Sequence, residues 1–114
     1  MRYAVLIYEK PGAYDRFSDD ERRAVSAEYL ELARDGRVVG GAQLQGLETA
    51  TTVRVQDGQS LITDGPFADT KEVFGGFYLL EAADLDAALG FAERIPATRL
   101  GGCVEVRPLV EPAP

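Results

Sequence analysis

The chain has 114 residues, enough for one folded domain, and its 46% hydrophobic and 27% charged residues are typical of a globular protein. Nineteen acidic and twelve basic residues give a net charge of −7, and an acidic surface disfavours binding to nucleic acid. The absence of histidine excludes Ser-His and Cys-His nucleophilic sites and His-ligated metal centres. The single cysteine excludes an internal disulfide.

The first apolar run is too short for a signal peptide. It covers residues 3–8 and is closed by Glu9 and Lys10, whereas a signal peptide needs about 7–15 apolar residues. No run in the chain approaches the roughly 20 apolar residues of a membrane span. We therefore expect a cytoplasmic protein that makes no contact with membranes.

The first third of the chain predicts a strand, a helix and a second strand. Residues 3–8 are rich in β-formers. Ser18 and Glu21 have the spacing of a capping box and predict a helix over residues 18–35. Its apolar stripe consists of Val25, Tyr29 and Leu32. Residues 38–44 predict the second strand, which paired glycines weaken.

The middle of the chain predicts a hairpin. Apolar and polar residues alternate over 51–56, with Val53 and Val55 on one face. Asp57-Gly58 is a strong signal for a two-residue turn, and residues 61–63 form the return strand.

The last third predicts a strand, a helix and a final strand. Residues 77–82 are apolar, and Asp84 is a candidate N-cap for an amphipathic helix that Pro96 stops. Residues 103–107 alternate, with Val104 and Val106 directed inward. We expect a single domain over residues 1–110 and a flexible C-terminal tail over residues 111–114.

This order of elements predicts an α+β fold, a ferredoxin-like βαββαβ pattern with an inserted β-hairpin. Its two central strands are apolar on both faces: Tyr3, Val5 and Ile7 alternate with Ala4, Leu6 and Tyr8, and Phe77 and Leu79 with Tyr78 and Leu80. The helices cover only one face of such a sheet. We expect the other face to be buried against a second copy, because exposed apolar sheet faces are usually covered.

The segment Asp64-Gly65-Pro66-Phe67, followed by Lys71-Glu72 and by Gly75-Gly76-Phe77-Tyr78-Leu79, resembles the DGPF group of the YCII-related protein family. The likeness extends to Thr51-Thr52-Val53-Arg54, Asp57-Gly58 and residues 104–108. It implies a dimeric α+β barrel with a ferredoxin-like subunit, an enzyme-like cleft, and genes that often lie beside those of extracytoplasmic-function sigma factors. The better-studied YCII branch has a His–Asp pair as its proposed catalytic site. This chain has no His, so only the acidic half can have an equivalent, for which Asp64 is our candidate.

Asp64, Lys71 and Glu72 form the richest candidate catalytic cluster. A desolvated carboxylate can act as a base, and a neighbouring ammonium can polarise a carbonyl or hold an anion. The structural alternative is that Asp64-Gly65-Pro66 is only a turn, that Asp69 and Glu72 cap one helical turn, and that Lys71 pairs with a surface carboxylate.

Three further residues are candidate substrate-binding groups. Arg54 could bind a carboxylate in bidentate fashion, or it could be a solvated residue of an exposed strand. Tyr8 and Tyr78 could donate to a ligand in a dimer cleft, or they could pack a core and bond one partner.

The remaining motifs predict no cofactor and no metal. The glycine pairs 40–41, 75–76 and 101–102 do not have the form of a dinucleotide-binding loop and favour bulges or close backbone approach. The carboxylate spacing does not resemble a calcium loop. Cys103 has no cationic neighbour in the sequence, and we expect it to be a buried, inert thiol.

The leading functional hypothesis is a small acid–base enzyme of the isomerase or lyase type that acts on a small polar metabolite. In this hypothesis Asp64 is the base or an orienting group, Lys71 its electrostatic partner, and Arg54 an anion anchor. The alternatives are a non-catalytic ligand-binding or accessory protein linked to an extracytoplasmic-function sigma factor, and a structural dimer with an empty cleft.

Overall fold

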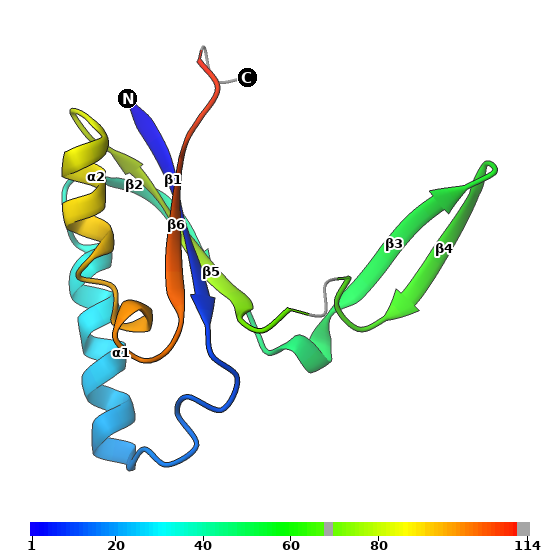
Figure 1. The fold of residues 1–114 in the computed structure, drawn as a ribbon, viewed down its shortest axis with the longest axis horizontal. Helices are drawn as coiled ribbons and strands as arrows, with labels where there is room; N and C mark the ends of the chain where they lie inside the picture. The colour runs from blue at the N-terminus through cyan, green and yellow to red at the C-terminus, as the bar shows by residue number, and fades with distance from the viewer. Residues whose placement is uncertain (68–69, 112–114) are drawn as a thin grey trace.

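A computed structural model describes residues 1–67 and 70–111 of the chain. Four antiparallel strands form one sheet in the order β2-β5-β1-β6, and a separate two-stranded sheet pairs β3 with β4. Both helices cover the same face of the larger sheet (Figure 1). The elements in chain order are β1 (Arg2–Glu9), α1 (Asp19–Ala33), β2 (Val38–Gln43), the 3₁₀ turn η1 (Leu47–Thr49), β3 (Thr51–Gln56), β4 (Gln59–Asp64), β5 (Val73–Glu81), α2 (Leu85–Ala92), the 3₁₀ turn η2 (Pro96–Thr98) and β6 (Cys103–Pro108). The predicted ferredoxin-like order with an inserted hairpin is confirmed.

Local sequence signals account for most element boundaries. The Ser18 hydroxyl accepts from the Glu21 amide and the Glu21 carboxylate accepts from the Ser18 amide, each at 3.1 Å, so the capping box that starts α1 is complete. Asp84 caps α2 by accepting from the Ala87 amide at 2.9 Å. The turn between β3 and β4 has positive φ at Asp57 and Gly58, 51° and 77°, as the hairpin signal predicts.

The core lies between the sheet and the two helices. Tyr3, Val5 and Ile7 of β1 are at most 5% exposed, because β1 has a strand on each side and helices above this face. Leu80 of β5 and Phe91 of α2 are also buried against them. Val104 and Val106 pack against the same core, which confirms their predicted inward orientation.

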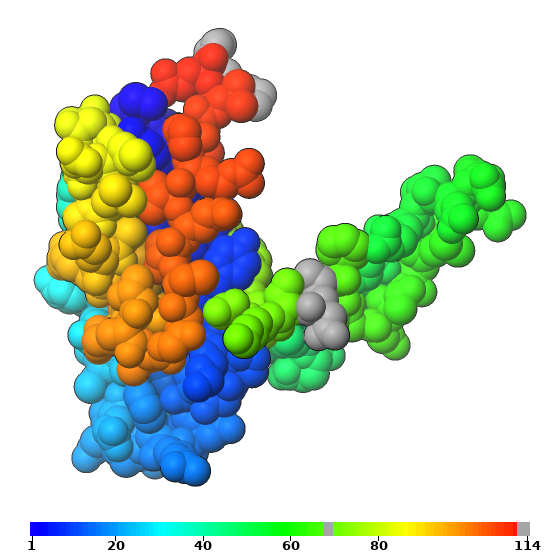
Figure 2. All heavy atoms as spheres, viewed as in Figure 1, coloured from blue at the N-terminus to red at the C-terminus, as the bar shows by residue number. Residues whose placement is uncertain are grey.

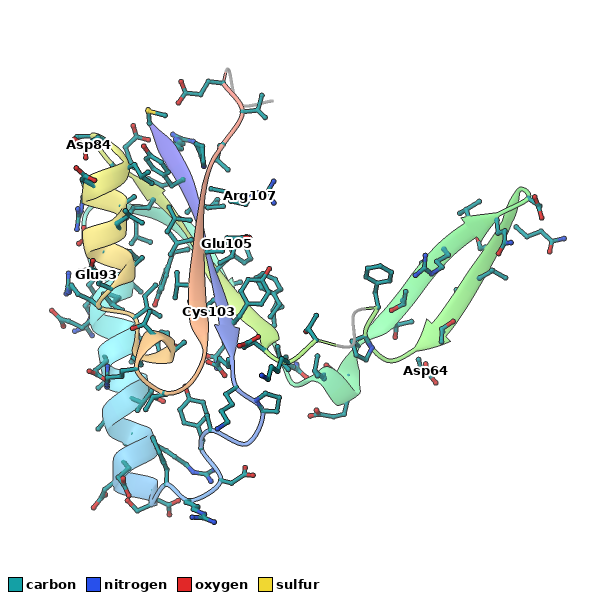
Figure 3. All side chains as sticks on the ribbon, viewed as in Figure 1. Asp64, Asp84, Glu93, Cys103, Glu105 and Arg107 are labelled. Atoms are coloured by element: carbon teal, nitrogen blue, oxygen red, sulfur yellow. The ribbon has the colours of Figure 1, made fainter. Side chains whose placement is uncertain are left out.

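The opposite face of the sheet has no layer over it in the described chain. We call it the uncovered face; it is formed by the side chains that alternate with the core residues, namely Ala4, Leu6, Tyr8, Phe77, Leu79, Cys103, Glu105 and Arg107. The register places Leu6 between Phe77 and Glu105, and Ala4 between Leu79 and Arg107. Figure 3 shows that the labelled Cys103, Glu105 and Arg107 belong to β6.

The prediction of a buried thiol at Cys103 is wrong for this chain. Cys103 is exposed, because it alternates with Val104, which faces the core, and therefore lies on the uncovered face. The local apolar context of a strand cannot distinguish its two faces, and the inward direction of Val104 decides the outward direction of Cys103.

The hairpin β3–β4, which we call the arm, projects from the end of the sheet (Figures 1 and 2). Its apolar side chains are exposed: Val53, Val55 and Ile62 are 62%, 71% and 70% accessible. The radius of gyration is 16.1 Å, whereas a compact domain of this length has about 13 Å. The arm accounts for this excess because it stands clear of the packed layers.

Several predicted boundaries differ from the structure. β5 begins at Val73 rather than residue 77, and α2 ends at Ala92, so Pro96 begins the 3₁₀ turn η2 instead of stopping the helix directly. Ala68 and Asp69 of the predicted loop, and residues 112–114 of the predicted tail, lie outside the described residues. No helix in the described part of the chain has the length and apolar character needed to cross a membrane.

Candidate functional site

A cavity of about 990 Å³ lies between α1 and the sheet, beside strands β2 and β5. Its apolar wall includes Ile7, Val25 and Val38, and glycines of β2 and β5 form part of it. The polar side chains that line it are Glu9, Tyr14, Arg22, Ser26, Tyr29, Gln43 and Tyr78. A large, mostly apolar cavity with a few polar groups is the usual form of a small-molecule site.

Glu9 is the ionisable group best placed for chemistry in this cavity. It ends β1 and continues the alternation of Tyr3, Val5 and Ile7, so its side chain turns toward the helix-covered face. Burial raises the pKa of this carboxyl above its ordinary value, and the hydrogen bond from Tyr14 opposes that rise. The Tyr14 hydroxyl donates to Glu9 Oε1 at 3.4 Å.

A glycine on β5 leaves room for the Glu9 carboxylate. A Cβ atom built on Gly75 would lie 3.4 Å from Glu9 Cδ and 3.5 Å from Glu9 Cγ. A side chain at residue 75 would therefore press on the carboxyl group. Gly75 is also the unpaired residue at the register shift between β1 and β5, and a bulge is one of the roles that we expected of the paired glycines.

Two tyrosines extend the polar cluster from Glu9 toward α1. Tyr14 lies in the β1–α1 connection, and Arg22 holds that connection by donating from Nη2 to the Tyr14 carbonyl at 2.8 Å. The Tyr29 hydroxyl is buried and has no hydrogen-bond partner among the described residues. Burial, then the proximity of Tyr14 and Glu9, raises the pKa of Tyr29 well above its ordinary value, so this phenol stays protonated.

The arrangement suits proton transfer to and from a small bound molecule. A carboxyl group whose pKa is raised toward neutrality is a better general base than an ordinary surface carboxylate. The neighbouring phenols supply uncharged hydrogen-bond donors. Among the described residues no group of three or more metal-ligating side chains is placed to hold a metal ion.

One residue of the sequence-predicted site lies in the cavity wall. Tyr78 lines the cavity, and its hydroxyl donates to the Tyr29 carbonyl at 2.9 Å. Tyr8 points to the uncovered face and packs on Phe74, with 5.4 Å between ring centroids.

The predicted catalytic residues lie elsewhere in the chain. Asp64 ends β4 and is exposed on the arm (Figure 3), and Arg54 of β3 stacks on Phe67 with its Cζ 4.6 Å from the ring centroid. Lys71 is exposed and Glu72 is half-buried, in the segment before β5, where the Thr70 hydroxyl donates to the Glu72 carbonyl. Asp64, Arg54, Lys71 and Glu72 are not part of the cavity lining that the described residues form.

Glu9, Tyr14 and Tyr29 are not among the site residues predicted from the sequence. Glu9 is a charged residue that continues the alternation of Tyr3, Val5 and Ile7, but its burial follows only from the structure, which shows that the helices cover this face. Tyr14 follows a turn with no periodic pattern, and the stripe of α1 marked Tyr29 as a core residue. Only the packing of α1 on the sheet brings these two phenols to Glu9.

Comparisons with known proteins place the fold and the family. The chain is similar in structure to 5-chloro-2-hydroxyhydroquinone dehydrochlorinase (TftG) of Burkholderia phenoliruptrix AC1100, solved in complex with 2,5-dihydroxybenzoquinone. The similarity covers 100% of both chains, with a TM-score of 0.52 and 20% sequence identity. An uncharacterized protein of Rhizobium meliloti strain 1021 is 41% identical over 117 residues, covering 96% of this chain and 92% of the relative. The family model described as the YCII-related domain matches residues 1–112. The chain therefore belongs to the YCII-related family.

Proposed function

We propose that the protein is a small acid–base enzyme, of the lyase or isomerase type, that acts on a small polar molecule bound in the cavity beside Glu9. The observation that carries the proposal is the Glu9 carboxyl itself. It lies in the wall of a 990 Å³ cavity, burial raises its pKa, and a tyrosine hydroxyl holds it in place. The likeness of the fold to that of a dehydrochlorinase supports an enzyme of this kind.

The proposed step is a proton transfer. The Glu9 carboxylate takes a proton from a carbon or hydroxyl of the ligand and becomes a carboxylic acid. In an isomerisation it returns that proton to a second atom of the ligand. In an elimination the electron pair of the broken bond forms a new π bond, the leaving group departs with its own bonding pair, and Glu9 later loses the proton to water.

The loop residues that the sequence singled out remain a competing proposal for the same chemistry. Asp64, Lys71 and Glu72 would then act from the arm and its base, with Arg54 as the anion anchor. We assign the base to Glu9 instead, and the turnover of variants at the two sites distinguishes the two proposals.

The test begins with a ligand. A metabolite library is screened by thermal shift, because a ligand at 100 times its Kd stabilises the folded protein by about 2.7 kcal/mol. Stabilising compounds are then assayed for turnover with the wild type, Glu9→Gln and Glu93→Gln, an exposed glutamate at the end of α2 that serves as the matched control (Figure 3).

We expect Glu9→Gln to lose at least about 100-fold in kcat while still binding the ligand, and Glu93→Gln to match the wild type. Turnover retained by Glu9→Gln but lost by Asp64→Asn or Lys71→Ala would assign the chemistry to the loop instead. Binding without turnover in the wild type would favour the non-catalytic binding or accessory protein.

We also propose that the protein is a homodimer, joined through the uncovered face. This face leaves Leu6, Phe77 and Leu79 half-buried in the single chain. Glu105 and Arg107 of the same face cancel in charge, so two copies do not repel there although each chain has a net charge of −7.

A further inference from the structure

In the described part of the chain, no strand of the larger sheet pairs with the arm. It pairs only β3 with β4, and an isolated two-stranded hairpin is marginally stable in water. The register places Val53 opposite Ile62 and Val55 opposite Ser60, so Val53, Val55 and Ile62 share one apolar face. All three are more than 60% exposed. A ribbon of this kind needs a surface to pack on.

We propose that this apolar face of the arm, formed by Val53, Val55 and Ile62, packs on a second copy of the chain. The inference rests on the homodimer proposed above and extends it to a segment outside the sheet. Figures 1 and 2 show the arm projecting on the side of the sheet away from the helices, where a partner that covers the uncovered face would lie.

The sizes of the two surfaces favour this occupant. At about 4.8 Å between strands and 3.3 Å per residue, the four-stranded face spans about 400 Å² and each face of the arm about 200 Å². A standard interface removes about 800 Å² from each partner. The sheet face alone supplies about half of that area, and the arm raises the contact to about three quarters of it.

A second copy, placed by one twofold rotation, covers both the apolar face of the arm and the uncovered face of the sheet. The same chain has an apolar ribbon and an apolar sheet face that its own geometry keeps apart. A twofold axis that places the two sheets together gives each arm access to the other subunit and makes the contact self-complementary. A different protein would have to match two separate surfaces of this chain.

The charges on this side of the arm do not oppose the contact. Asp57 lies in the turn, and Asp64 shares this face but lies at the base of the arm, so the apolar patch itself carries no charge. Arg54 lies on the other face of β3, where Phe67 stacks on it. The patch can therefore be buried without desolvating a charged side chain.

The experiment compares Ile62→Asp with its neighbour Thr63→Asp by sedimentation equilibrium of the full chain. Both residues are exposed in β4 and point to opposite faces of the arm. We expect Ile62→Asp to raise the dimer Kd by tenfold or more, and Thr63→Asp to change it by less than about twofold. Equal effects of the two variants would overturn the assigned face.

The outcomes separate the arm from the dimer. A wild type that dimerises together with an Ile62→Asp variant that dimerises equally well would overturn the role of the arm and leave the homodimer intact. A wild type that is monomeric at micromolar concentration would overturn both. Amide exchange of the wild type needs no substitution: we expect β3 and β4 amides to exchange more slowly above the dimer Kd than below it, and equal rates would contradict the proposal.

Discussion

β1 and the arm have the same alternation of apolar side chains but different environments. Tyr3, Val5 and Ile7 of β1 are at most 5% exposed, whereas Val53 and Val55 of β3 are 62% and 71% exposed. β1 has strands on both sides and helices above one face, while β3 pairs with β4 alone among the described strands. An alternating pattern therefore tells which side chains share a face, and the neighbouring elements decide whether that face is covered.

The largest expected difference is between substitutions on the two faces of β1. Val5→Asp places an unpaired charge in the core, where Val5 is 0% exposed, and we expect it to cost at least about 4 kcal/mol and to unfold the chain. Leu6→Asp lies on the uncovered face, so we expect a folded chain that no longer dimerises. Circular dichroism and sedimentation measure the two outcomes. A folded Val5→Asp variant would contradict the observed core.

The next comparison sets a core aromatic against an arm residue. Phe91→Ala removes a ring that is 1% exposed and packs edge-on against Tyr78, and we expect a loss of about 3–5 kcal/mol in the free energy of unfolding. Val55→Ala, in a residue 71% exposed, should change the unfolding of the monomer by less than about 0.5 kcal/mol. Denaturant titration of both variants in the Leu6→Asp background checks this difference without a contribution from dimerisation.

We expect smaller effects from changes to two local sequence signals, the helix cap at Ser18 and the hairpin turn at Gly58. Ser18→Ala removes the capping box of α1, and we expect it to lower the stability of the whole domain by about 1 kcal/mol. Gly58→Ala places a side chain at φ 77°, which costs about 1–2 kcal/mol within the arm. We expect only Ser18→Ala to lower the melting temperature of the Leu6→Asp monomer, and only Gly58→Ala to speed amide exchange in the arm. A fall in the melting temperature with Gly58→Ala would show that the arm and the rest of the chain unfold together.

The smallest effect is the pH dependence that Glu9 contributes. Its pKa is raised in the folded protein, so between the ordinary pKa of 4.5 and the folded pKa the unfolded chain has released this proton while the folded chain still holds it. The stabilisation is fully present below pH 4.5 and is lost as the pH rises through the folded pKa. We expect Glu9→Gln to flatten this decline in a pH series of denaturant titrations, and an unchanged profile would contradict the raised pKa.

The fold could be predicted from local signals that do not depend on distant contacts. The capping residues Ser18 and Asp84 and the turn residues Asp57 and Gly58 act on neighbouring backbone, and the structure confirms each. The cavity could not be predicted in the same way. Glu9, Tyr14 and Tyr29 come from a strand, a connection and a helix, and they meet only when α1 packs on the sheet.

The sequence by itself determined the order of the elements and the alternation that divides each strand into two faces, because both follow from the local periodicity of side chains. It could not tell which face of β1 the helices cover, and the tertiary structure decided that Val5 is buried and Leu6 is not. The same choice placed Cys103 outside and turned Glu9 into the cavity. The physical reason is that the two faces of a central strand are chemically alike in this chain, so only the connections that carry α1 and α2 over one of them distinguish the two.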